Sequence, residues 1–333
     1  MSAKAQFHEI RAPARIDLAG GTVDIWPICL LERGAVTVNL AIDRFATARA
    51  RLRDDGAYVL ASTDKGVQSK HLDLASLRGE TALPLHREIA LMLRPEGGLE
   101  ISTRSDVPAG SGLGGSSALF VAATRAALQA AQRQMDNDAL LRHVIDMEAR
   151  IIGVPTGSQD YISAIHGGLS AVRFPPGGAQ RDAINVELDD VARRIVLVYT
   201  GVPHDSAMNN WQITKAYLDG DADVRRHMHD IAEAARILRG ALLVNDLDAA
   251  ADAINSDWAA RRALAPGVST KEIDQLGTLA KAAGAMAMKV CGAGGGGSVF
   301  FWCAEGKRES VAQAMKDAGA EVLKFKPEPL GAR

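Results

Sequence analysis

A glycine-rich segment at residues 108–117 constrains the fold of this chain more than any other feature. It reads Pro-Ala-Gly-Ser-Gly-Leu-Gly-Gly-Ser-Ser. Residues 99–104 before it have the mixed apolar pattern of a strand, and residues 116–134 after it are apolar nearly all round, as in a buried helix. Glycine backbone lets N–H groups converge on an anion, and a helix start adds N–H groups and the positive end of its dipole. The order of strand, glycine loop and helix therefore predicts a phosphate cradle.

Three other interpretations compete for the same glycines. Gly110, Gly112 and Gly115 fit the GxGxxG fingerprint of dinucleotide-binding folds, but the fit is weak because no strand ending in an acidic residue follows about 20 residues later. A Walker A loop needs a lysine before the serine, whereas Gly115 is followed directly by Ser116. From this segment alone, a glycine-rich turn that binds no ligand also stays open.

The composition is that of an ordinary globular protein of about two domains, with 333 residues, 47% hydrophobic and 23% charged. The net charge of −2 gives no general attraction to nucleic acid or to an anionic membrane. Three cysteines without a CxxC spacing favour a reducing compartment. The start of the chain lacks the apolar region of a secretory signal, and no apolar run is long enough to span a bilayer. We therefore expect a cytoplasmic protein that acts on neither nucleic acid nor membranes.

The pattern along the chain predicts strands and helices in separate groups. Strands are expected at 7–18, 35–42, 46–53, 99–104, 169–174, 195–199, 286–291, 298–303 and 321–325. Helices are expected at 116–134, 137–152, 208–218, 224–243, 246–262, 271–283 and 307–318. Grouped helices rather than strict alternation favour an α+β fold. The Pro/Gly stretch 174–178 is the expected boundary between a domain of residues 1–178 and one of residues 179–333.

Two further segments, one before and one after the glycine segment, complete a recognisable series of motifs. Residues 11–24 read Arg-Ala-Pro-Ala-Arg-Ile-Asp-Leu-Ala-Gly-Gly-Thr-Val-Asp, and residues 289–298 read Lys-Val-Cys-Gly-Ala-Gly-Gly-Gly-Gly-Ser. With Gly-Leu-Gly-Gly-Ser-Ser-Ala between them, they resemble the motifs of the GHMP kinases, such as galactokinase, homoserine kinase, mevalonate kinase and phosphomevalonate kinase. The resemblance implies an N-terminal domain related to domain 2 of ribosomal protein S5 and a ferredoxin-like C-terminal domain. It also implies an ATP-dependent small-molecule kinase.

The extra glycine of the middle motif resembles the D-glycero-D-manno-heptose 7-phosphate kinases and the L-fucokinase-type enzymes. That branch usually reads Ala-Gly-Gly-Gly-Thr-Asp where residues 19–24 here read Ala-Gly-Gly-Thr-Val-Asp, so Val23 replaces a hydroxyl beside Asp24. We expect a sugar or sugar phosphate as acceptor, with a heptose 7-phosphate first and fucose-like hexoses next. A mevalonate-pathway kinase or decarboxylase of the same superfamily, and a non-catalytic nucleotide- or sugar-binding sensor, are the alternatives.

The resemblance implies that the phosphates of ATP lie over the glycine segment at the helix start. The implied ATP-binding residues are Pro108, Gly110, Ser111, Gly112, Leu113, Gly114, Gly115, Ser116 and Ser117. The expected cation is Mg²⁺, which takes oxygen ligands and completes its shell with phosphate and water. Ser117 and Glu148 match the metal-binding positions of the family. The residues alone would also allow Glu148 to be a solvated helical glutamate paired with Arg142 or Arg150.

Two residues match catalytic positions of the family. Asp160, within Thr-Gly-Ser-Gln-Asp-Tyr-Ile-Ser at 156–163, is expected to orient the acceptor hydroxyl and to take its proton. Arg15 stands where mevalonate kinases carry a catalytic lysine, and its guanidinium would pair with Asp160 and the transferring phosphate. On the residues alone, Asp160 could instead cap a turn and Arg15 could form a surface salt bridge.

The remaining candidates concern the acceptor. By the pattern of the family, Asp24, Gly21 and Thr22 are expected to bind substrate hydroxyls, and Gly294 and Gly295 to shape the site. An exposed turn carboxylate and a glycine-rich hairpin without ligand are the alternatives. Residues 200–211 resemble a Tyr-Thr-Gly segment of the heptose kinase branch and are expected to border the substrate, with an ordinary capped loop as the alternative.

Overall fold

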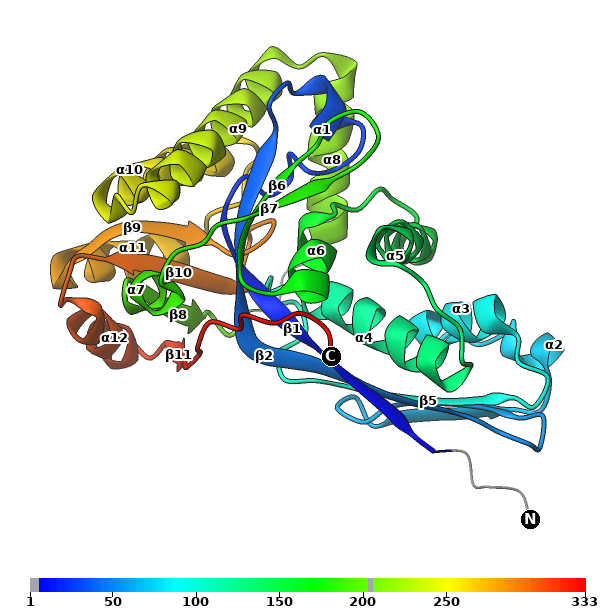
Figure 1. Ribbon diagram of the computed structural model, residues 1–333. Helices are drawn as coiled ribbons and strands as arrows, with labels where there is room; N and C mark the ends of the chain where they lie inside the picture. Colours follow the sequence, from blue (N-terminus) through cyan, green and yellow to red (C-terminus); the bar gives the residue numbers. More distant parts are fainter. Residues whose placement is uncertain (1–5, 203–205) are drawn as a thin grey trace.

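Two β-sheets with helices grouped around them make up the fold (Figure 1). The structure is a computed structural model that describes residues 6–202 and 206–333. The first sheet holds β1 (His8–Ala19), β2 (Val36–Leu52), β3 (Tyr58–Ser62), β4 (Val67–His71), β5 (Leu99–Ser105), β6 (Leu169–Arg173) and β7 (Gln180–Ala183). The second holds β8 (Ile195–Tyr199), β9 (Ala285–Val290), β10 (Ser298–Cys303) and β11 (Glu321–Leu323).

The helices of the first half of the chain are α1 (Ile28–Leu31), α2 (Leu74–Leu77), α3 (Pro84–Leu93), α4 (Gly115–Ala130), α5 (Asn137–Ile152) and α6 (Gln159–His166). Those of the second half are α7 (Leu188–Arg193), α8 (Ser206–Asp219), α9 (Ala222–Leu243), α10 (Leu247–Ala263), α11 (Lys271–Ala283) and α12 (Arg308–Asp317). Among the residues that the structure describes, β3 and β5 are the one parallel pair of strands. The expected α+β class is confirmed. No helix within the described ranges is long and apolar enough to cross a membrane.

The long strand β2 organises the first sheet. Its first part pairs with β6 over Val36–Leu40 and its last part with β5 over Ala46–Leu52, while β1 runs beside almost its whole length. The sequence predicted two strands here, separated by a break near Asp43 and Arg44. These two residues instead form a bulge against β1, because the pairing of Pro13 with Phe45 is followed by that of Ala14 with Ile42.

Helix α4 is the central helix of the first half. It packs on β1 and β2, and α3 and α5 lie beside it over the same face of the sheet (Figure 1). Its inward residues are mostly alanine, which lets the helix approach the sheet closely, and Phe120 meets Tyr161 of α6 edge-on with ring centroids 6.5 Å apart. This packing fixes the start of α4, and with it the end of the glycine segment.

The second sheet is buried between two helical layers. Phe300 and Trp302 of β10 point toward α9 and α10, whereas Val299 and Phe301 point toward α11 and α12, as the two-residue period of a strand requires. The cluster on the α9–α10 side also includes Ile16 of β1. The two halves of the chain therefore share one continuous hydrophobic core.

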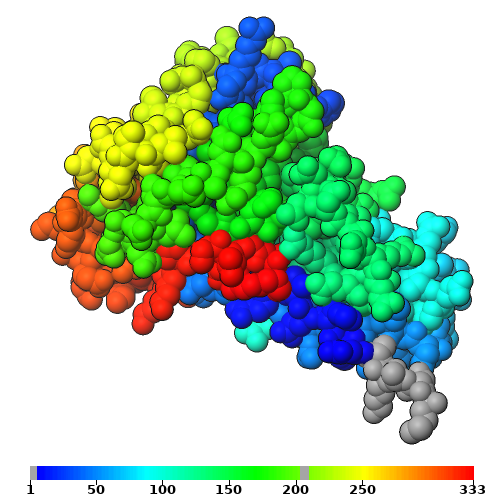
Figure 2. All heavy atoms as spheres, viewed as in Figure 1, coloured from blue at the N-terminus to red at the C-terminus, as the bar shows by residue number. Residues whose placement is uncertain are grey.

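The last residues of the chain return to the first sheet. Pro327 bridges to Ile42, and Arg11 and Arg333 exchange two backbone hydrogen bonds of 2.8 and 3.0 Å. Figure 2 shows this segment, in red, crossing from the region of the second sheet to that of the first. The division into residues 1–178 and 179–333 stays a proposal; residue 178 lies in the turn between β6 and β7, two paired strands of the first sheet.

Candidate active site

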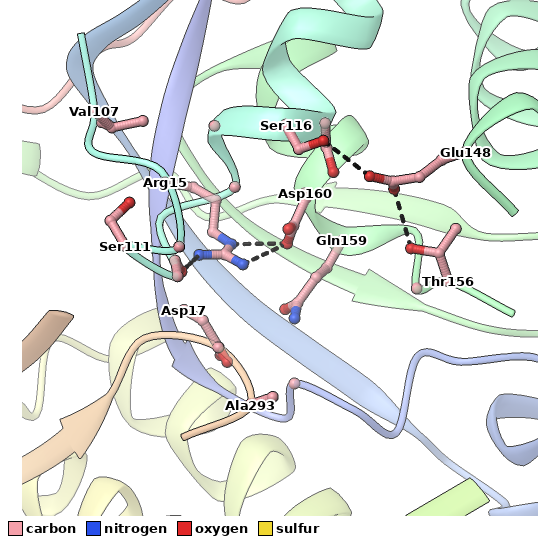
Figure 3. Close-up of a pocket in the computed structure, with 18 of the residues that line it drawn as sticks. Arg15, Asp17, Val107, Ser111, Ser116, Glu148, Thr156, Gln159, Asp160 and Ala293 are labelled. Atoms are coloured by element: carbon pink, nitrogen blue, oxygen red, sulfur yellow. Dashed lines mark hydrogen bonds and ion pairs between the residues drawn. The ribbon is translucent and has the colours of Figure 1, made fainter. Parts of the chain in front are cut away.

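A cavity of about 520 Å³ lies where the two halves of the chain meet. The glycine segment, the loop after β1, the start of α6 and residues 292–293 of the second glycine run line it (Figure 3). These are parts of all three motifs that the sequence singled out. The fold thus brings together segments that are more than 250 residues apart in the chain.

The glycine segment is fixed by both halves of the molecule. The backbone N–H of Arg15 on β1 donates to the carbonyl of Leu113 at 2.9 Å, and that of Ser298 on β10 donates to the carbonyl of Ser111 at 2.8 Å. The Arg15 guanidinium also donates to the carbonyl of Gly112. The loop is therefore held in place before any ligand binds.

The start of α4 opens onto the cavity. Its N-cap residue, Gly114, has φ of +72° and no side-chain cap within the described residues, and Gly115, Ser116 and Ser117 of the first turn line the cavity. The first N–H groups of a helix have no partner within the helix, so they are available to an anion. This is the geometry expected of the predicted phosphate cradle.

Arg15 and Asp160 form an ion pair at the centre of the cavity (Figure 3). Nε and Nη2 of Arg15 lie 2.8 and 2.7 Å from Oδ1 of Asp160, which stands in the first turn of α6. Burial alone would lower the pKa of Arg15, but the carboxylates of Asp160 and Asp17 outweigh burial and raise it. The guanidinium is therefore a permanent cation between the glycine segment and Asp160.

The buried Asp24 lines the same cavity, beside the start of α6. Its Oδ2 accepts the backbone N–H groups of Ser158 at 2.7 Å and Gln159 at 3.0 Å, so it caps α6 from a distant loop. Burial raises the pKa of Asp24 to about 6, although these two N–H groups oppose the rise. A Cβ on Gly157 would lie 2.1 Å from Asp24 Oδ2, which explains the glycine before α6.

The carboxylate of Glu148, on α5, accepts hydrogen bonds from hydroxyl groups at the edge of the cavity (Figure 3). Ser116 donates to its Oε1 at 3.1 Å, and Thr156 at 3.2 Å and Tyr161 donate to its Oε2. Burial raises the pKa of the Glu148 carboxyl, and the three hydroxyl donors oppose that rise. The expectation of a solvated surface glutamate does not describe this residue, which is 8% exposed.

The carboxylate and hydroxyl oxygens around Glu148 are the ligand type that Mg²⁺ prefers. The described residues hold no cluster of three or more His, Cys, Asp or Glu side chains that could bind a metal by itself. A cation here would therefore need further oxygens from water and phosphate, which is how Mg²⁺ commonly binds. Glu148 and Ser117 both line the cavity, so their oxygens are available to such an ion, and Ser116 is the serine that contacts Glu148.

Three of the expected site residues do not line the cavity. Leu113 is fully buried in the core shared by the two halves. Gly294 and Gly295 face the loop at Val268. The carbonyl of Val268 accepts the N–H of Gly295 at 2.9 Å, and a Cβ added to Gly294 would lie 2.6 Å from the same carbonyl oxygen. Gly292 and Ala293, earlier in the same run, line the cavity instead.

The departure at Val23 does not face the cavity either. Val23 is fully buried in a cluster with residues of α8 and α9. Thr22, one residue earlier, lines the cavity instead. A hydroxyl is therefore present in this loop, and the apolar residue at position 23 serves packing.

Sequence reasoning missed several residues of the cavity wall. Asp17, Thr156 and Gln159 lie within the recognised motifs, in which roles were predicted only for neighbouring residues. Their place inside these motifs was the signal that could have identified them as cavity residues. Lys65, in the turn between β3 and β4, carried no signal because these two strands were not predicted. Of the segment 200–211, Asn210 lines the cavity, whereas residues 203–205 lie outside the described residues.

The arrangement is that of a group-transfer site. Gly114 at the anion cradle lies against Asp160 and the Arg15 cation, and Asp24 accepts the N–H of Gln159, the residue next to Asp160. Such a site can hold a polyphosphate against a second, hydroxyl-bearing molecule and exclude much of the water between them. Fold and site together define the class of small-molecule phosphotransferases.

Two family models match the chain at these motifs. The GHMP kinases N terminal domain matches residues 80–168, which include the glycine segment and Asp160. The GHMP kinases C terminal domain matches residues 238–321, which include α10 and the second glycine run. Together they match more than half of the residues. The chain belongs to the GHMP kinases, which are ATP-dependent enzymes.

Individual relatives span nearly the whole chain. A D-glycero-alpha-D-manno-heptose 7-phosphate kinase of Campylobacter jejuni is 26% identical over 326 residues, 95% of each protein. A bifunctional fucokinase/GDP-fucose pyrophosphorylase of Arabidopsis thaliana is 24% identical over 87% of this chain and 29% of that protein. The solved structure of a D-glycero-D-manno-heptose 1-phosphate kinase of Bacteroides thetaiotaomicron superposes with a TM-score of 0.77, at 23% identity over 98% of each chain. The two-domain GHMP kinase fold is confirmed.

Proposed function

We propose that this protein transfers the γ-phosphate of ATP to a hydroxyl of a sugar or sugar phosphate. One observation carries the proposal: the Arg15–Asp160 ion pair lies between the phosphate cradle and the loop of Asp24. A Cβ on Gly114, at the cradle, would lie only 3.3 Å from Oδ2 of Asp160. A phosphate on the cradle and a hydroxyl on the other side would thus both reach this carboxylate.

The proposed roles follow from these positions. The first-turn N–H groups of α4 and the glycine segment bind the phosphates of ATP, and Arg15 offsets negative charge on the group in transfer. The acceptor oxygen forms the new bond to the γ-phosphorus as the bond from phosphorus to the β,γ-bridging oxygen breaks, and ADP leaves. Asp160 orients the acceptor hydroxyl and accepts its proton.

Mg²⁺ is the proposed cation, with Glu148 and Ser117 as its protein contacts. When bound, it neutralises phosphate charge during transfer. The buried carboxylate of Glu148 suits this role because, among the described residues, its hydrogen-bond donors are three hydroxyl groups and none of them is cationic.

The acceptor is proposed from the names of the relatives and from the cavity. Heptose phosphates and fucose are the substrates that the relatives' names indicate. Asp24, Thr22 and Gln159 offer the hydrogen-bonding groups that a polyhydroxylated molecule needs. A heptose 7-phosphate is the first candidate and a fucose-like hexose the second. A cytoplasmic location, which suits the three unpaired and buried cysteines, is also part of the proposal.

A coupled assay of ADP release tests the proposal. The protein would be incubated with ATP, Mg²⁺ and a panel of heptose phosphates, hexoses and mevalonate. Release of ADP that depends on one sugar or sugar phosphate supports the proposal. Release with mevalonate alone would point to a mevalonate-pathway enzyme, and ATP binding without release on any acceptor would point to a non-catalytic sensor.

A further inference from the structure

The loop that follows β1 has an unusual backbone. It carries Thr22 and Asp24 into the acceptor side of the cavity. Gly20 has φ of +87°, and Thr22 has φ of +75° although it is a β-branched residue. Positive φ is a genuine outlier for such a residue, and it persists only where surrounding structure enforces it. The contacts that enforce it here come from the other half of the chain.

Helix α10 supplies these contacts through two charged side chains. Arg261 donates from Nη2 to the carbonyl of Gly21 at 2.6 Å and from Nη1 to the hydroxyl of Thr22 at 3.2 Å. Oδ2 of Asp257 accepts the backbone N–H of Gly20 at 2.7 Å. Three consecutive residues of the loop are therefore held by one pair of side chains.

The two side chains also pair with each other, out of contact with solvent. Nε of Arg261 lies 3.2 Å from Oδ1 of Asp257, and the side chains are 2% and 0% exposed. A second fully buried pair, Asp17 with Lys289 at 2.8 Å, lies at the base of the same loop, where Lys289 also donates to the carbonyl of Asp17. Four charges are thus buried beneath an acceptor loop of five residues.

Stability alone does not account for such a pair. Well-packed apolar residues of similar volume are commonly as stabilising as a buried ion pair, because both ions lose their hydration. Apolar residues could not, however, donate to Gly21 and Thr22 or accept from Gly20. The property that the ion pair adds is a defined conformation of the loop.

We propose that Arg261 and Asp257 are positioning residues for the acceptor. They act through the loop: by holding Gly20, Gly21 and Thr22 they aim the Thr22 hydroxyl and the Asp24 carboxylate into the cavity. The proposal rests on the proposed kinase function. Within the described residues, neither side chain has a hydrogen bond to the glycine segment, so the effect of losing them falls on the acceptor and not on ATP.

Steady-state kinetics of three variants test this role. Arg261→Met removes the donors at similar volume and is expected to raise the KM of the acceptor roughly tenfold or more, the effect of a lost hydrogen bond to a charged group. The KM of ATP is expected to stay at the wild-type value. Arg261→Lys should recover part of the loss. The matched control is Arg262→Met, because the next guanidinium on α10 is 47% exposed, and its contacts with Asp274 and the Trp258 ring do not involve the loop.

A neutral double variant covers the case in which the single variant fails to fold. Asp257→Asn with Arg261→Met keeps an acceptor for the N–H of Gly20 and leaves no unpaired buried charge. A purely structural role predicts that the folded double variant has the wild-type KM for the acceptor. The positioning role predicts the raised KM at an unchanged melting temperature.

Hydrogen exchange measured on the protein without ligands separates this proposal from the proposed function. Peptides that cover residues 18–26 are expected to exchange faster in either Arg261→Met variant, and peptides that cover residues 108–117 are not. Wild-type exchange in the loop together with a wild-type acceptor KM would overturn the positioning role. If the wild-type protein phosphorylates no acceptor, the proposed kinase function is wrong. Hydrogen exchange in residues 18–26 still shows in that case whether α10 holds the loop after β1.

Discussion

At the scale of single residues, Asp160 is the group on which the proposed chemistry depends. It stands between the phosphate cradle and the acceptor loop and is paired with Arg15. Asp160→Asn keeps the shape but cannot accept a proton, so kcat is expected to fall about 10²- to 10⁴-fold, the usual contribution of a general base. ATP affinity, measured by calorimetry, should not change, because the cradle is built by α4 and the glycine segment.

Asp189→Asn is the matched control for this variant. Asp189 also stands in the first turn of a helix, α7, so both substitutions remove one charge near a helix N-terminus. Asp189 is exposed and does not line the cavity. Equal turnover of the two variants would show that Asp160 has no part in the reaction.

Asp24 gives the reaction an expected pH dependence. Burial raises its pKa to about 6, so the carboxylate is ionised above that pH and becomes protonated as the pH falls below it. A protonated Asp24 accepts fewer hydrogen bonds from sugar hydroxyls. We therefore expect kcat/KM for the acceptor to fall below pH 6, by a limiting slope of about tenfold per pH unit.

Asp24→Asn tests the origin of that dependence. It should lower kcat/KM at neutral pH and abolish the fall near pH 6. It should not lower the melting temperature at pH 8, where the wild-type protein has to keep a buried carboxylate ionised. A fall near pH 6 that persists in the variant would assign the titration to another group.

At the scale of elements, the start of α4 can be tested with a pair of glycines. Gly114 directly precedes α4 and Gly153 directly follows α5, and both have left-handed backbone, with φ of +72° and +75°. A Cβ on Gly114 would lie 3.3 Å from Asp160 Oδ2 and 3.4 Å from Arg15 Cγ, whereas one on Gly153 meets no described atom within 4 Å. Only the first substitution disturbs the site.

Alanine at either position is expected to lower the free energy of unfolding by about 1–2 kcal/mol, the cost of left-handed backbone for a residue with a Cβ. Gly114→Ala should in addition lower kcat/KM for ATP, because it moves the cradle against the Arg15–Asp160 pair. Urea unfolding and steady-state kinetics of both variants measure the two effects. Equal activity of the two would mean that the cradle is not at the start of α4.

Much of the element order could be predicted from sequence. Helices α5 and α11 and strands β8 and β10 have the predicted bounds, because their apolar periods are clear. β4 and β7 were missed because their residues are mostly polar at a sheet edge, and α6 because it is only eight residues long. The motifs identified the cavity, but not that Leu113 turns into the core or that Gly294 and Gly295 face Val268.

The charges beneath the acceptor loop could not be predicted for a different reason. Asp257 and Arg261 have the i, i+4 spacing of an ordinary surface pair on a helix. Nothing in the spacing says that α10 turns this face toward a loop more than 230 residues earlier. Burial of such a pair is decided by tertiary packing, which the sequence pattern of one helix does not contain.

At the scale of the whole molecule, the C-terminal segment connects the two halves. Residues 326–333 make backbone hydrogen bonds to β1, β2 and the end of α6, through the pairs Asp43–Lys326, Ala41–Glu328, Gly168–Glu328, Ala164–Ala332 and Arg11–Arg333. Each bond is worth a net ~1 kcal/mol, so deletion of residues 326–333 is expected to lower the free energy of unfolding by several kcal/mol. Urea unfolding measures the loss.

A single substitution gives a milder test of the same segment. A Cβ on Gly331 would lie 1.9 Å from the carbonyl oxygen of Ile165, whereas one on Gly319 meets no described atom within 4 Å. Gly331→Ala should therefore lower the urea midpoint more than Gly319→Ala does, even though Gly319 has the left-handed backbone. The opposite order would show that the segment contributes little to stability.

The central claim is that ATP and a sugar meet at Asp160, and mass spectrometry of the reaction products tests it most directly. The protein would be incubated with ATP, Mg²⁺ and the panel of sugars and sugar phosphates. We expect one acceptor to gain a single phosphoryl group, with one ADP formed for each, and Asp160→Asn to form at least about a hundredfold less of both products in the same time. ADP formed without any phosphorylated sugar, or equal product from Asp160→Asn, would contradict the claim.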